Sequence, residues 1–385
     1  MSRPTLAIYN LYWSTYGGGE QVSGALAEYL SRHFEVTLLG PDRPDVAQTK
    51  ARLDVDISGC AWRRVVDDSE ASEASADFDV FVNGTYRSHS VNRASAGYYY
   101  VHFPEPPVEP RRRVVSAVAR TGLTVMKAAP RMPERLEGVR RGLTRRVIDT
   151  SWSRSYTDFW SNSRYTADWV TRLWGVESRV LHPPVRPSVQ PGVKVPVIAS
   201  IGRFFDPSLG HSKKQLDLVR AFNSMGDSGD WRLVLVGGAD GASRDYALAV
   251  RREAVGHRVD VHLNAPRHVV EETLAGASIY WHGGGFGEDP ERHPERFEHF
   301  GIAVVEAMAA GAVPVVFAAA GPAEIVRHGV DGFHWRTIDE LQRLTARLID
   351  DTEMRQRMSA AARERAGDFT VTRFDEGLGH LIGIS

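Results

Sequence analysis

The 385-residue sequence contains very little cysteine, because Cys60 is the only one. A single thiol excludes an intramolecular disulfide and a zinc site built from cysteines, and it suits a reducing compartment. The net charge is also close to zero, since 47 Lys and Arg residues are balanced by 48 Asp and Glu residues. No overall field marks the chain as a nucleic-acid binder, so a charged partner has to be met by a local group of residues.

Long hydrophobic runs are missing as well. No apolar run reaches about 18 residues without a charge, so we expect no transmembrane helix. Residues 5–13 (TLAIYNLYW) are short, lack a basic flank and lead directly into glycines, unlike a signal peptide. We therefore expect a cytoplasmic protein.

The sequence does contain the same pattern of segments twice. Short apolar segments alternate with segments of helical spacing, which indicates parallel sheets covered on both faces. In the first half the expected strands are residues 5–13, 34–40, 77–84, 97–103 and 158–163, with helices at 20–34 and 165–174. In the second half the expected strands are residues 197–204, 231–238, 259–263, 278–284 and 313–318, with helices at 214–225, 244–255 and 268–276.

The chain length fits two domains of roughly 150 to 200 residues better than one hydrophobic core. A proline-rich stretch, residues 180–196, separates the two series. We therefore predict an α/β fold with domains at 1–187 and 188–365, followed by a helix within 366–385 that can cross back to the first domain. Ligands of such sheets bind beyond the carboxyl ends of the strands, which predicts a shared cleft.

Gly17, Gly18 and Gly19 lie between an expected strand and an expected helix. Missing side chains let backbone amides and the helix amino terminus approach an anion. Turn chemistry alone also explains such glycines. Their spacing differs from the G-x-G-x-x-G of dinucleotide folds, which argues against a nicotinamide or flavin cofactor.

The first loop of the second half concentrates positive charge. Arg203 ends an expected strand, and Lys213 and Lys214 begin the next helix. Cations at a helix amino terminus oppose the helix dipole, and a bound polyanion would remove that conflict. A solvated basic loop is the alternative interpretation.

Two glutamates lie eight positions apart in the segment EHFGIAVVEAMAAG. We expect a helix to begin near Gly301, which places Glu298 in the preceding loop and Glu306 in the second turn. Both carboxylates can then meet one ligand at the helix amino terminus. Alternatively, Glu298 is a simple helix-start carboxylate and Glu306 is a salt-bridged residue at the edge of the core.

Taken together, these motifs closely resemble glycosyltransferase family 4. The resemblance rests on E-x₇-E at Glu298 and Glu306, on GIAVVEAMAAGAVPVV and GPAEIVRHGVDGF, and on GRF and KKQLDLVRAF upstream. It implies a retaining enzyme of the GT-B fold that uses a nucleotide sugar, with an amino-terminal acceptor domain and a carboxyl-terminal donor domain. YGGGEQV and YVHFP add a similarity to the α-mannosyltransferases that extend lipid-linked oligosaccharides.

The resemblance also implies roles for individual residues. Arg203 and Lys214 would hold the donor diphosphate, Glu306 would bind the ribose, and Glu298 would contact the transferred sugar. The donor-binding residues expected in this way are Gly18, Gly19, Arg203, Lys214, Asn264, Phe300, Gly301, Ile302 and Glu306.

His102 matches the active-site histidine of the family. Many members have an acidic residue after it, whereas Phe103 and Pro104 follow here. The expected catalytic residues are therefore His102, Glu298, Arg203 and Lys214, while a purely structural histidine at a strand end stays an alternative.

The expected reaction transfers a hexose, mannose or glucose, from a GDP- or UDP-sugar to a glycan or lipid-linked acceptor through an α-glycosidic bond. Preplaced cations would stabilise the charge that grows on the diphosphate. No metal-binding D-x-D pair ends an expected strand, so we expect no metal and no cofactor besides the nucleotide sugar. No nucleophilic carboxylate of the glycosidase type is evident. The resemblance implies same-face attack, with the leaving phosphate accepting the proton of the acceptor.

Two other classes of function stay open. A relative of this fold could epimerise a nucleotide sugar or phosphorolyse a glucan. A catalytically silent protein that binds a nucleotide sugar is the non-enzyme alternative.

Residues 108–150 hold eleven Lys or Arg and four Asp or Glu, in a chain that is otherwise slightly acidic. The apolar residues Leu136, Val139, Leu143 and Val147 have helical spacing among arginines. This pattern is typical of a helix on an anionic membrane surface, so we expect peripheral contact with the inner face of a membrane. A solvated basic face packed on the first domain is equally compatible.

Overall fold

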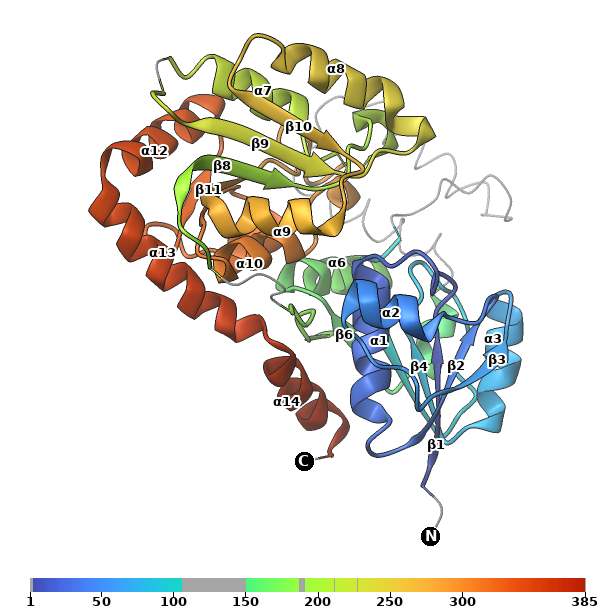
Figure 1. Cartoon of the computed structure of the whole chain (residues 1–385). Coiled ribbons are helices and arrows are strands. Elements are labelled where there is room, and N and C mark those ends of the chain that lie inside the picture. Colours follow the sequence, from blue (N-terminus) through green and yellow to red (C-terminus); the bar gives the residue numbers. More distant parts are fainter. Residues whose placement is uncertain (1–2, 106–149, 187–190, 211, 227, 385) are drawn as a thin grey trace, which may run out of the picture. The chain divides into compact units, whose positions relative to one another are not determined.

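The computed structural model describes residues 3–105, 150–186, 191–210, 212–226 and 228–384. It divides into two compact units, Met1–Leu181 and His182–Ser385 (Figure 1). The predicted domain bounds placed the junction slightly later, at 187/188. The predicted cleft between the domains, and the return of residues 366–385 to the first domain, stay predictions.

The first unit is built on a seven-stranded parallel sheet in the order β3-β2-β1-β4-β5-β6-β7. Its strands are β1 (Thr5–Tyr9), β2 (Glu35–Gly40), β3 (Ala61–Arg64), β4 (Val80–Asn83), β5 (Ala96–Val101), β6 (Asp158–Ser161) and β7 (Arg179–Val180). The α-helices among its described residues are α1 (Gly18–Leu30), α2 (Val46–Leu53), α3 (Asp68–Ala74) and α6 (Arg164–Trp174). One core of this unit is rich in aromatic residues, among them Tyr99 of β5 and Trp169 and Trp174 of α6.

The second unit contains a six-stranded parallel sheet in the order β10-β9-β8-β11-β12-β13. Its strands are β8 (Val195–Ile201), β9 (Arg232–Gly237), β10 (Val259–Leu263), β11 (Ala277–His282), β12 (Val313–Phe317) and β13 (Phe333–Trp335). Its described α-helices are α7 (Gln215–Asn223), α8 (Arg244–Ala254), α9 (Arg267–Gly276), α10 (Ile302–Ala309), α11 (Ala320–Ile325), α12 (Ile338–Asp350), α13 (Thr352–Ala366) and α14 (Val371–Ile382).

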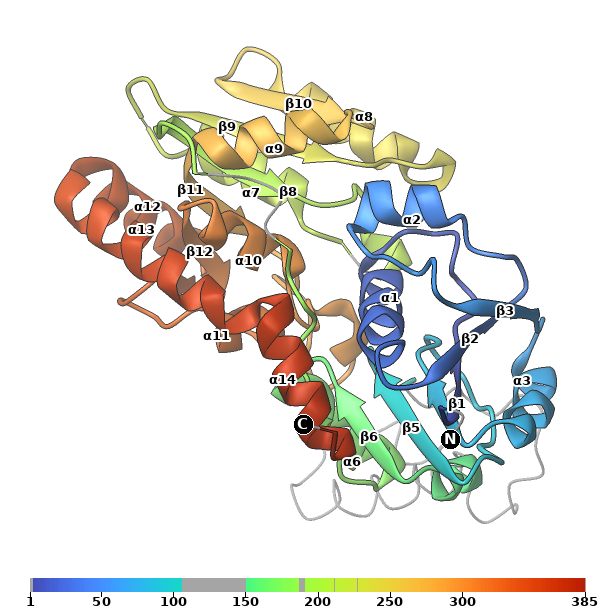
Figure 2. The same ribbon diagram turned by 60° about the horizontal axis from the view of Figure 1, so that its bottom comes forward.

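Helices cover both faces of the second sheet, because neighbouring residues of a strand point to opposite faces. Ile198 of β8 packs in one core with residues of α7, α8 and α12, whereas Ala199 packs in the other with residues of α9, α10 and α13. Figure 1 shows α7 and α8 on one side of this sheet and α9 and α10 on the other. Small side chains such as Ala307 and Ala362 let α13 pack along α10 (Figure 2).

These features confirm the predicted α/β fold class of two Rossmann-like units with parallel sheets. In each unit the strand order reverses once, between β1 and β4 in the first unit and between β8 and β11 in the second. Ligands of doubly wound sheets bind beyond the carboxyl ends of the strands at this reversal. The loops that follow these four strands are therefore the places to look for a site.

Candidate functional site

In the second unit, two loops follow the strands at the reversal: residues 202–214 after β8 and residues 283–301 after β11. The first loop is held close to the sheet. Gln215 donates hydrogen bonds from Nε2 to the carbonyl oxygens of Gly202 (3.2 Å) and Arg203 (3.0 Å). A Cβ atom on Gly237 would come within 1.9 Å of the Gly202 oxygen, so glycine is required for this close approach. Arg203 itself is exposed, with its guanidinium 5.9 Å from the Phe205 ring.

Lys213 and Glu298 bring the two loops together. The ammonium of Lys213 donates a hydrogen bond to Oε2 of Glu298, and both side chains are mostly buried. His282, the last residue of β11, places Nε2 3.4 Å from the same oxygen. Burial opposes ionisation of Glu298, but the charge of Lys213 and the hydrogen bond with His282 hold the pKa of this carboxyl well below its usual range. Glu298 is therefore a carboxylate at neutral pH.

Burial lowers the pKa of His282, so its imidazole is neutral near pH 7. A neutral imidazole that donates to a carboxylate must carry its proton on Nε2. Oε2 of Glu298 therefore has two hydrogen-bond donors, the charged ammonium of Lys213 and the neutral imidazole of His282.

Lys214 has a different partner from its neighbour. Its backbone is left-handed (φ 58°) at the cap position of α7. Its Nζ lies 2.6 Å from Oε1 of Glu288, and Nη1 of Arg296 lies 3.1 Å from the other oxygen of that carboxylate. The structure thus commits the ammonium of Lys214 to Glu288. The predicted contact of Lys214 with a diphosphate stays a prediction.

The helix α10 begins directly after Gly301, whose backbone has φ 114°. Phe300 is buried, with its ring 5.6 Å from those of His182 and Phe369. Glu298 lies in the loop before α10 and Glu306 in its second turn, as the sequence predicts. The amides of Phe300, Gly301 and Ile302 belong to the turn that starts this helix, where the helix dipole favours an anion.

Glu306 differs from Glu298 in its surroundings. Arg267, at the start of α9, has Nη2 3.6 Å from Oε1 of Glu306. Burial raises the pKa of the Glu306 carboxyl, and the charge of Arg267 offsets this only in part. The two carboxylates of the E-x₇-E pattern therefore have opposite pKa shifts.

Asn264 follows β10 in a left-handed conformation (φ 53°). Its side chain accepts a hydrogen bond from the amide of Ala239 (2.9 Å) and donates one to the Ala239 carbonyl (3.1 Å). It therefore joins the loops that follow β9 and β10. Its predicted donor contact stays a prediction.

In the first unit, the glycine turn leads from β1 into α1. Glu20 accepts hydrogen bonds at Oε2 from the amide of Gly17 (2.8 Å) and the hydroxyl of Thr15 (2.6 Å), which fixes the start of the helix. A Cβ atom on Gly19 would lie 3.4 Å from the ring of His102, so the imidazole packs directly against this turn. The structure thus brings together two of the predicted residues, Gly19 and His102.

His102 follows β5, and its Nε2 is 3.0 Å from the carbonyl oxygen of Gly84. Its own carbonyl accepts a hydrogen bond from Asn162 (2.8 Å). Burial lowers the pKa of His102, and the Gly84 carbonyl compensates only in part. Because a carbonyl oxygen only accepts hydrogen bonds, the neutral imidazole of His102 carries its proton on Nε2, the nitrogen that contacts Gly84.

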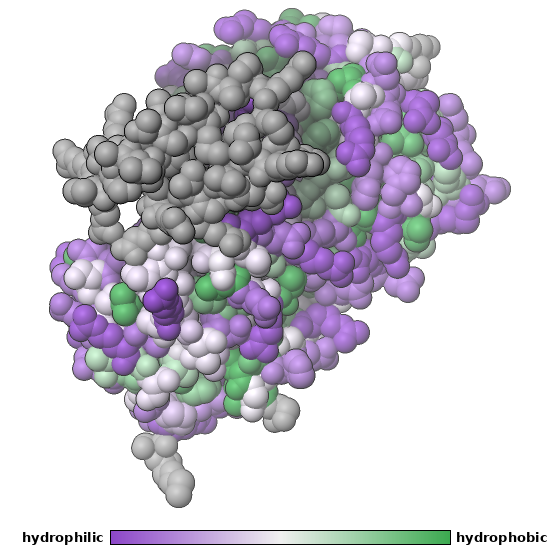
Figure 3. All heavy atoms as spheres, turned by 180° about the vertical axis from the view of Figure 1, so that it is seen from behind, coloured by the Kyte–Doolittle hydropathy of each residue, from purple (hydrophilic) through white to green (hydrophobic). Residues whose placement is uncertain are grey.

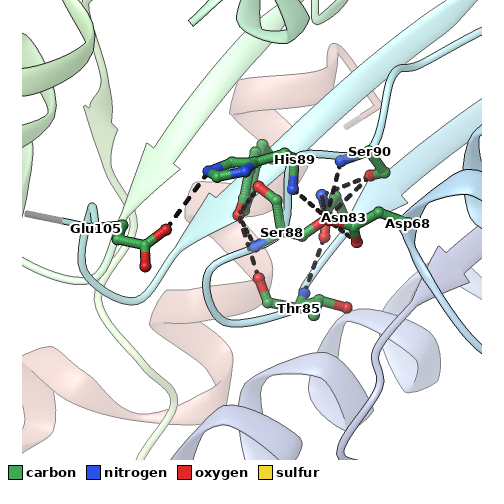
Figure 4. A network of polar contacts seen from close by, with 8 residues as sticks. Asp68, Asn83, Thr85, Ser88, His89, Ser90 and Glu105 are labelled. Carbon is green, nitrogen blue, oxygen red and sulfur yellow. Dashed lines mark hydrogen bonds and ion pairs between the residues drawn. The ribbon is translucent and has the colours of Figure 1, made fainter. Parts of the chain in front are cut away.

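A polar network holds the loop after β4 (Figure 4). Asp68 accepts hydrogen bonds from the hydroxyl of Ser88 (2.7 Å) and the amide of His89 (2.6 Å), and Asn83 donates to Ser88 (2.9 Å). Nε2 of His89 lies 3.6 Å from Oε2 of Glu105. The loop after β4, whose Gly84 carbonyl contacts His102, is therefore held by hydroxyl and amide groups and by the carboxylates of Asp68 and Glu105.

Several of these residues were missed from the sequence. His282 and Glu288 flank the glycine cluster HGGGFGE after β11, and Arg296 lies in the same loop. Their position beside that cluster was the available signal. The network around Asp68 joins residues too far apart in the chain for spacing to reveal it.

The predicted basic membrane-binding segment, residues 108–150, lies almost entirely outside the described residues. Within the part of the chain that the structure describes, no helix has both the length and the apolar character needed to cross a membrane. On the face seen in Figure 3, hydrophobic residues of the described part lie as separate patches among hydrophilic ones.

Comparison with known proteins agrees with this geometry. The family model described as glycosyl transferases group 1 matches residues 186–365. Over 235 residues the chain is 28% identical to the GDP-Man:Man(3)GlcNAc(2)-PP-Dol alpha-1,2-mannosyltransferase of Dictyostelium discoideum, a match that covers 55% of this chain and 44% of that protein. The matched part thus spans less than half the length of that relative.

Solved structures resemble the whole chain in fold. HepE of Anabaena in complex with UDP has a TM-score of 0.69 at 14% identity, covering 98% of this chain and 99% of that one. Sucrose-phosphate synthase of Thermosynechococcus elongatus has a TM-score of 0.66 at 15% identity, covering 98% of each chain. The loops that carry Arg203, Lys213, Glu298 and Glu306 all lie within residues 186–365, which match the model of glycosyl transferases group 1. The predicted resemblance to glycosyltransferases is thereby confirmed, and the match supports the predicted enzyme class.

Proposed function

We propose that the protein transfers a hexose from a nucleoside-diphosphate sugar to a glycan or lipid-linked acceptor, with retention, to form an α-glycosidic bond. One observation carries this proposal. At the strand reversal of the matched domain, Lys213 and Glu298 meet beside the amino terminus of α10, eight residues before Glu306. A cation, two carboxylates and a helix amino terminus at one place suit a ligand that has a diphosphate, a sugar and a ribose.

In the proposed reaction the bond between the anomeric carbon and the donor phosphate oxygen breaks, and the acceptor oxygen forms a bond with that carbon on the same face. The bonding electrons leave with the nucleoside diphosphate, which accepts the proton of the acceptor hydroxyl. Arg203, the α10 amides and a lysine stabilise the growing negative charge. Glu298 stabilises the positive charge that develops on the sugar.

We propose Lys213 as the phosphate-binding lysine, in place of Lys214 expected from the resemblance. Lys213 contacts Glu298, the carboxylate proposed to meet the sugar next to the diphosphate. Lys214 is buried on Glu288 instead. A diphosphate that drew Lys213 toward itself would leave Glu298 free to accept hydrogen bonds from the sugar.

Glu306 is proposed to accept hydrogen bonds from the ribose. Burial raises the pKa of this carboxyl, and its ion-pair partner Arg267 is 3.6 Å away. A ribose hydroxyl at hydrogen-bond distance would supply a closer partner. His102, kept neutral by burial, is proposed to meet the sugar or the acceptor in the first unit. Its Nε2 proton already bonds Gly84, which leaves Nδ1 as an acceptor for a hydroxyl.

The donor is proposed to be a GDP- or UDP-sugar, with mannose or glucose as the sugar. The relative from Dictyostelium is named for GDP-mannose and a lipid-linked acceptor, and HepE was solved with UDP and with UDP-glucose. Catalysis without a metal is part of the proposal, because Arg203 and Lys213 supply positive charge where the diphosphate would lie.

The test is incubation of the full chain with GDP-mannose or UDP-glucose and an oligosaccharide or lipid-linked acceptor, with and without EDTA. The proposal predicts an α-linked product, read from its anomeric proton, in equal yield under both conditions. A sugar isomer formed without acceptor would indicate an epimerase. A product formed only from glucan and inorganic phosphate would indicate a phosphorylase, and binding without turnover would indicate a silent protein.

Peripheral attachment at the inner face of a membrane is proposed from the charge of residues 108–150. The full chain should sediment with anionic liposomes at low salt and be released at high salt. Equal sedimentation with neutral liposomes would contradict the proposed attachment.

A further inference from the structure

The second unit contains a group of three mostly buried charged side chains that the proposed chemistry does not use. The group consists of Lys214, Glu288 and Arg296. Nζ of Lys214 lies 2.6 Å from Oε1 of Glu288, and Nη1 of Arg296 lies 3.1 Å from Oε2 of the same carboxylate. Their side chains are 10%, 12% and 30% exposed. A buried ion group adds little net stability, because the cost of desolvation offsets the attraction. Its effect is to fix the geometry of the segments it joins.

The group joins the two loops of the candidate site. Lys214 lies at the start of α7, whereas Glu288 and Arg296 lie in the loop between β11 and α10. The loop packs directly on the helix start, since a Cβ atom on Gly283 would lie 3.4 Å from both the Lys213 oxygen and Lys214 Cβ. Lys214 also holds a left-handed backbone, which is unusual for a residue with a side chain.

Two of the three members, Lys214 and Arg296, are close in sequence to a residue of the proposed donor site. Lys213 directly precedes Lys214, and Glu298 lies two residues after Arg296. The side chains of Lys213 and Glu298 meet each other. Any change in the spacing of the two loops would therefore move the phosphate-binding cation relative to the sugar-binding carboxylate.

We propose that Lys214, Glu288 and Arg296 form a clamp that positions Lys213 and Glu298 for the donor, and that Lys214 is a positioning residue that does not touch the diphosphate. The inference rests on the proposed function of this site. It names a role for three charged residues outside the E-x₇-E pattern, and it explains why two adjacent lysines have separate carboxylate partners.

The sign of one substitution separates the clamp from a simple effect of charge. Glu288→Gln removes a negative charge near a site for an anion, so Coulomb's law alone would strengthen diphosphate binding. The clamp predicts the opposite, because Gln holds Lys214 and Arg296 less firmly and the two loops lose their spacing. Loss of one well-placed charge-assisted hydrogen bond corresponds to roughly ten- to a hundred-fold in affinity, so we expect diphosphate affinity to fall by about that factor.

The experiment is calorimetric titration of GDP and of UDP into the full-length wild type, Lys214→Met, Glu288→Gln and the double variant. The clamp predicts that both single variants bind more weakly and that the double variant binds no more weakly than the worse single one. Glu288→Asp keeps the charge and shortens the side chain, so it should also weaken binding. Arg232→Met serves as the control and should leave affinity unchanged. It breaks an exposed ion pair with Asp260 at the amino-terminal ends of the strands, whereas the candidate site follows their carboxyl-terminal ends.

Unchanged or tighter binding by Glu288→Gln would overturn the clamp. So would a loss in Lys214→Met that is equally large in the Glu288→Gln background, since Lys214 would then contact the diphosphate itself. If Glu288→Gln does not fold by circular dichroism, Glu288→Asp decides by the same criterion. Failure of the wild type to bind either GDP or UDP would refute the proposed function as well, which distinguishes the two failures.

Discussion

The two units have the same kind of sheet but different chemistry at the strand reversal. In the second unit, the loops after β8 and β11 carry ion pairs: Lys213 with Glu298, and Lys214 with Glu288. In the first unit, the loop after β4 is held by hydroxyls and amides around Asp68, with the neutral His102 beside it. Charged groups suit an anionic ligand, whereas neutral donors and acceptors suit sugar hydroxyls. The difference is the reason for the proposal that the second unit binds the diphosphate and the first unit a neutral polyol.

Replacing the carboxylate proposed to meet the sugar should have the largest effect. Glu298→Gln removes a charge that is worth more in the transition state than in the ground state, so kcat should fall by about 10²- to 10³-fold with a smaller change in donor KM. Steady-state kinetics measure both constants. Affinity for the free nucleoside diphosphate should not fall, because Lys213 is released from its ion pair. A rise in KM with kcat unchanged would place Glu298 on the ribose instead.

His102→Ala tests the first unit. Loss of a positioned neutral imidazole should lower kcat by roughly 10²-fold, while donor affinity changes little. Circular dichroism checks the fold, since the ring also packs against Gly19. Full turnover in a folded variant would return His102 to a structural role and would remove the chemical contrast between the units.

Glu306→Gln should have a moderate effect of a different kind. The ribose does not change during the reaction, so its contact contributes equally to ground and transition states. Donor KM should rise by an amount equivalent to about 1.5 to 3 kcal/mol, with kcat nearly unchanged. A fall in kcat without a rise in KM would show that the roles of the two glutamates are exchanged.

The smallest effect concerns stability in acid. The pKa of Glu298 is lowered in the folded chain, so its ion pair stabilises the fold above the ordinary glutamate pKa, and this stabilisation is lost as pH falls through the lowered value. Wild type should exceed Glu298→Gln in unfolding free energy by no more than about 1.5 kcal/mol at pH 7, and the difference should shrink below about pH 4.5. Denaturant titrations across this range measure it. A difference that stays constant down to pH 3 would show that the ion pair does not contribute.

The hydrophobic spacing and the glycines of the sequence predicted the positions of individual strands and helix starts. The strand 259–263 has the predicted bounds. The helix α10 begins one residue after Gly301, so Glu298 lies before the helix and Glu306 in its second turn, as predicted. Apolar strands and glycine turns are encoded over a few residues, so spacing reveals them.

The parts that were not predicted depend on single backbone conformations and long-range contacts. Which of two adjacent lysines meets Glu298 is decided by the left-handed turn at Lys214, and a positive φ at lysine has no sequence signature. His282 is a lone histidine at a strand end, and only the folded chain brings it to Glu298. The same holds for Asp68, whose partners lie about twenty residues away in sequence.

The most direct test of the contrast between the units is the affinity of the free nucleoside diphosphate for Lys213→Met. Calorimetry with GDP and UDP should show a loss of about ten-fold or more relative to wild type, because one charge-assisted hydrogen bond to the ligand is removed. The control Arg232→Met should bind as wild type does, because Arg232 is the first residue of β9 and the candidate site follows the carboxyl-terminal ends of the strands. If Lys213→Met binds the diphosphate as tightly as the control, the charged loops of the second unit are not the donor site.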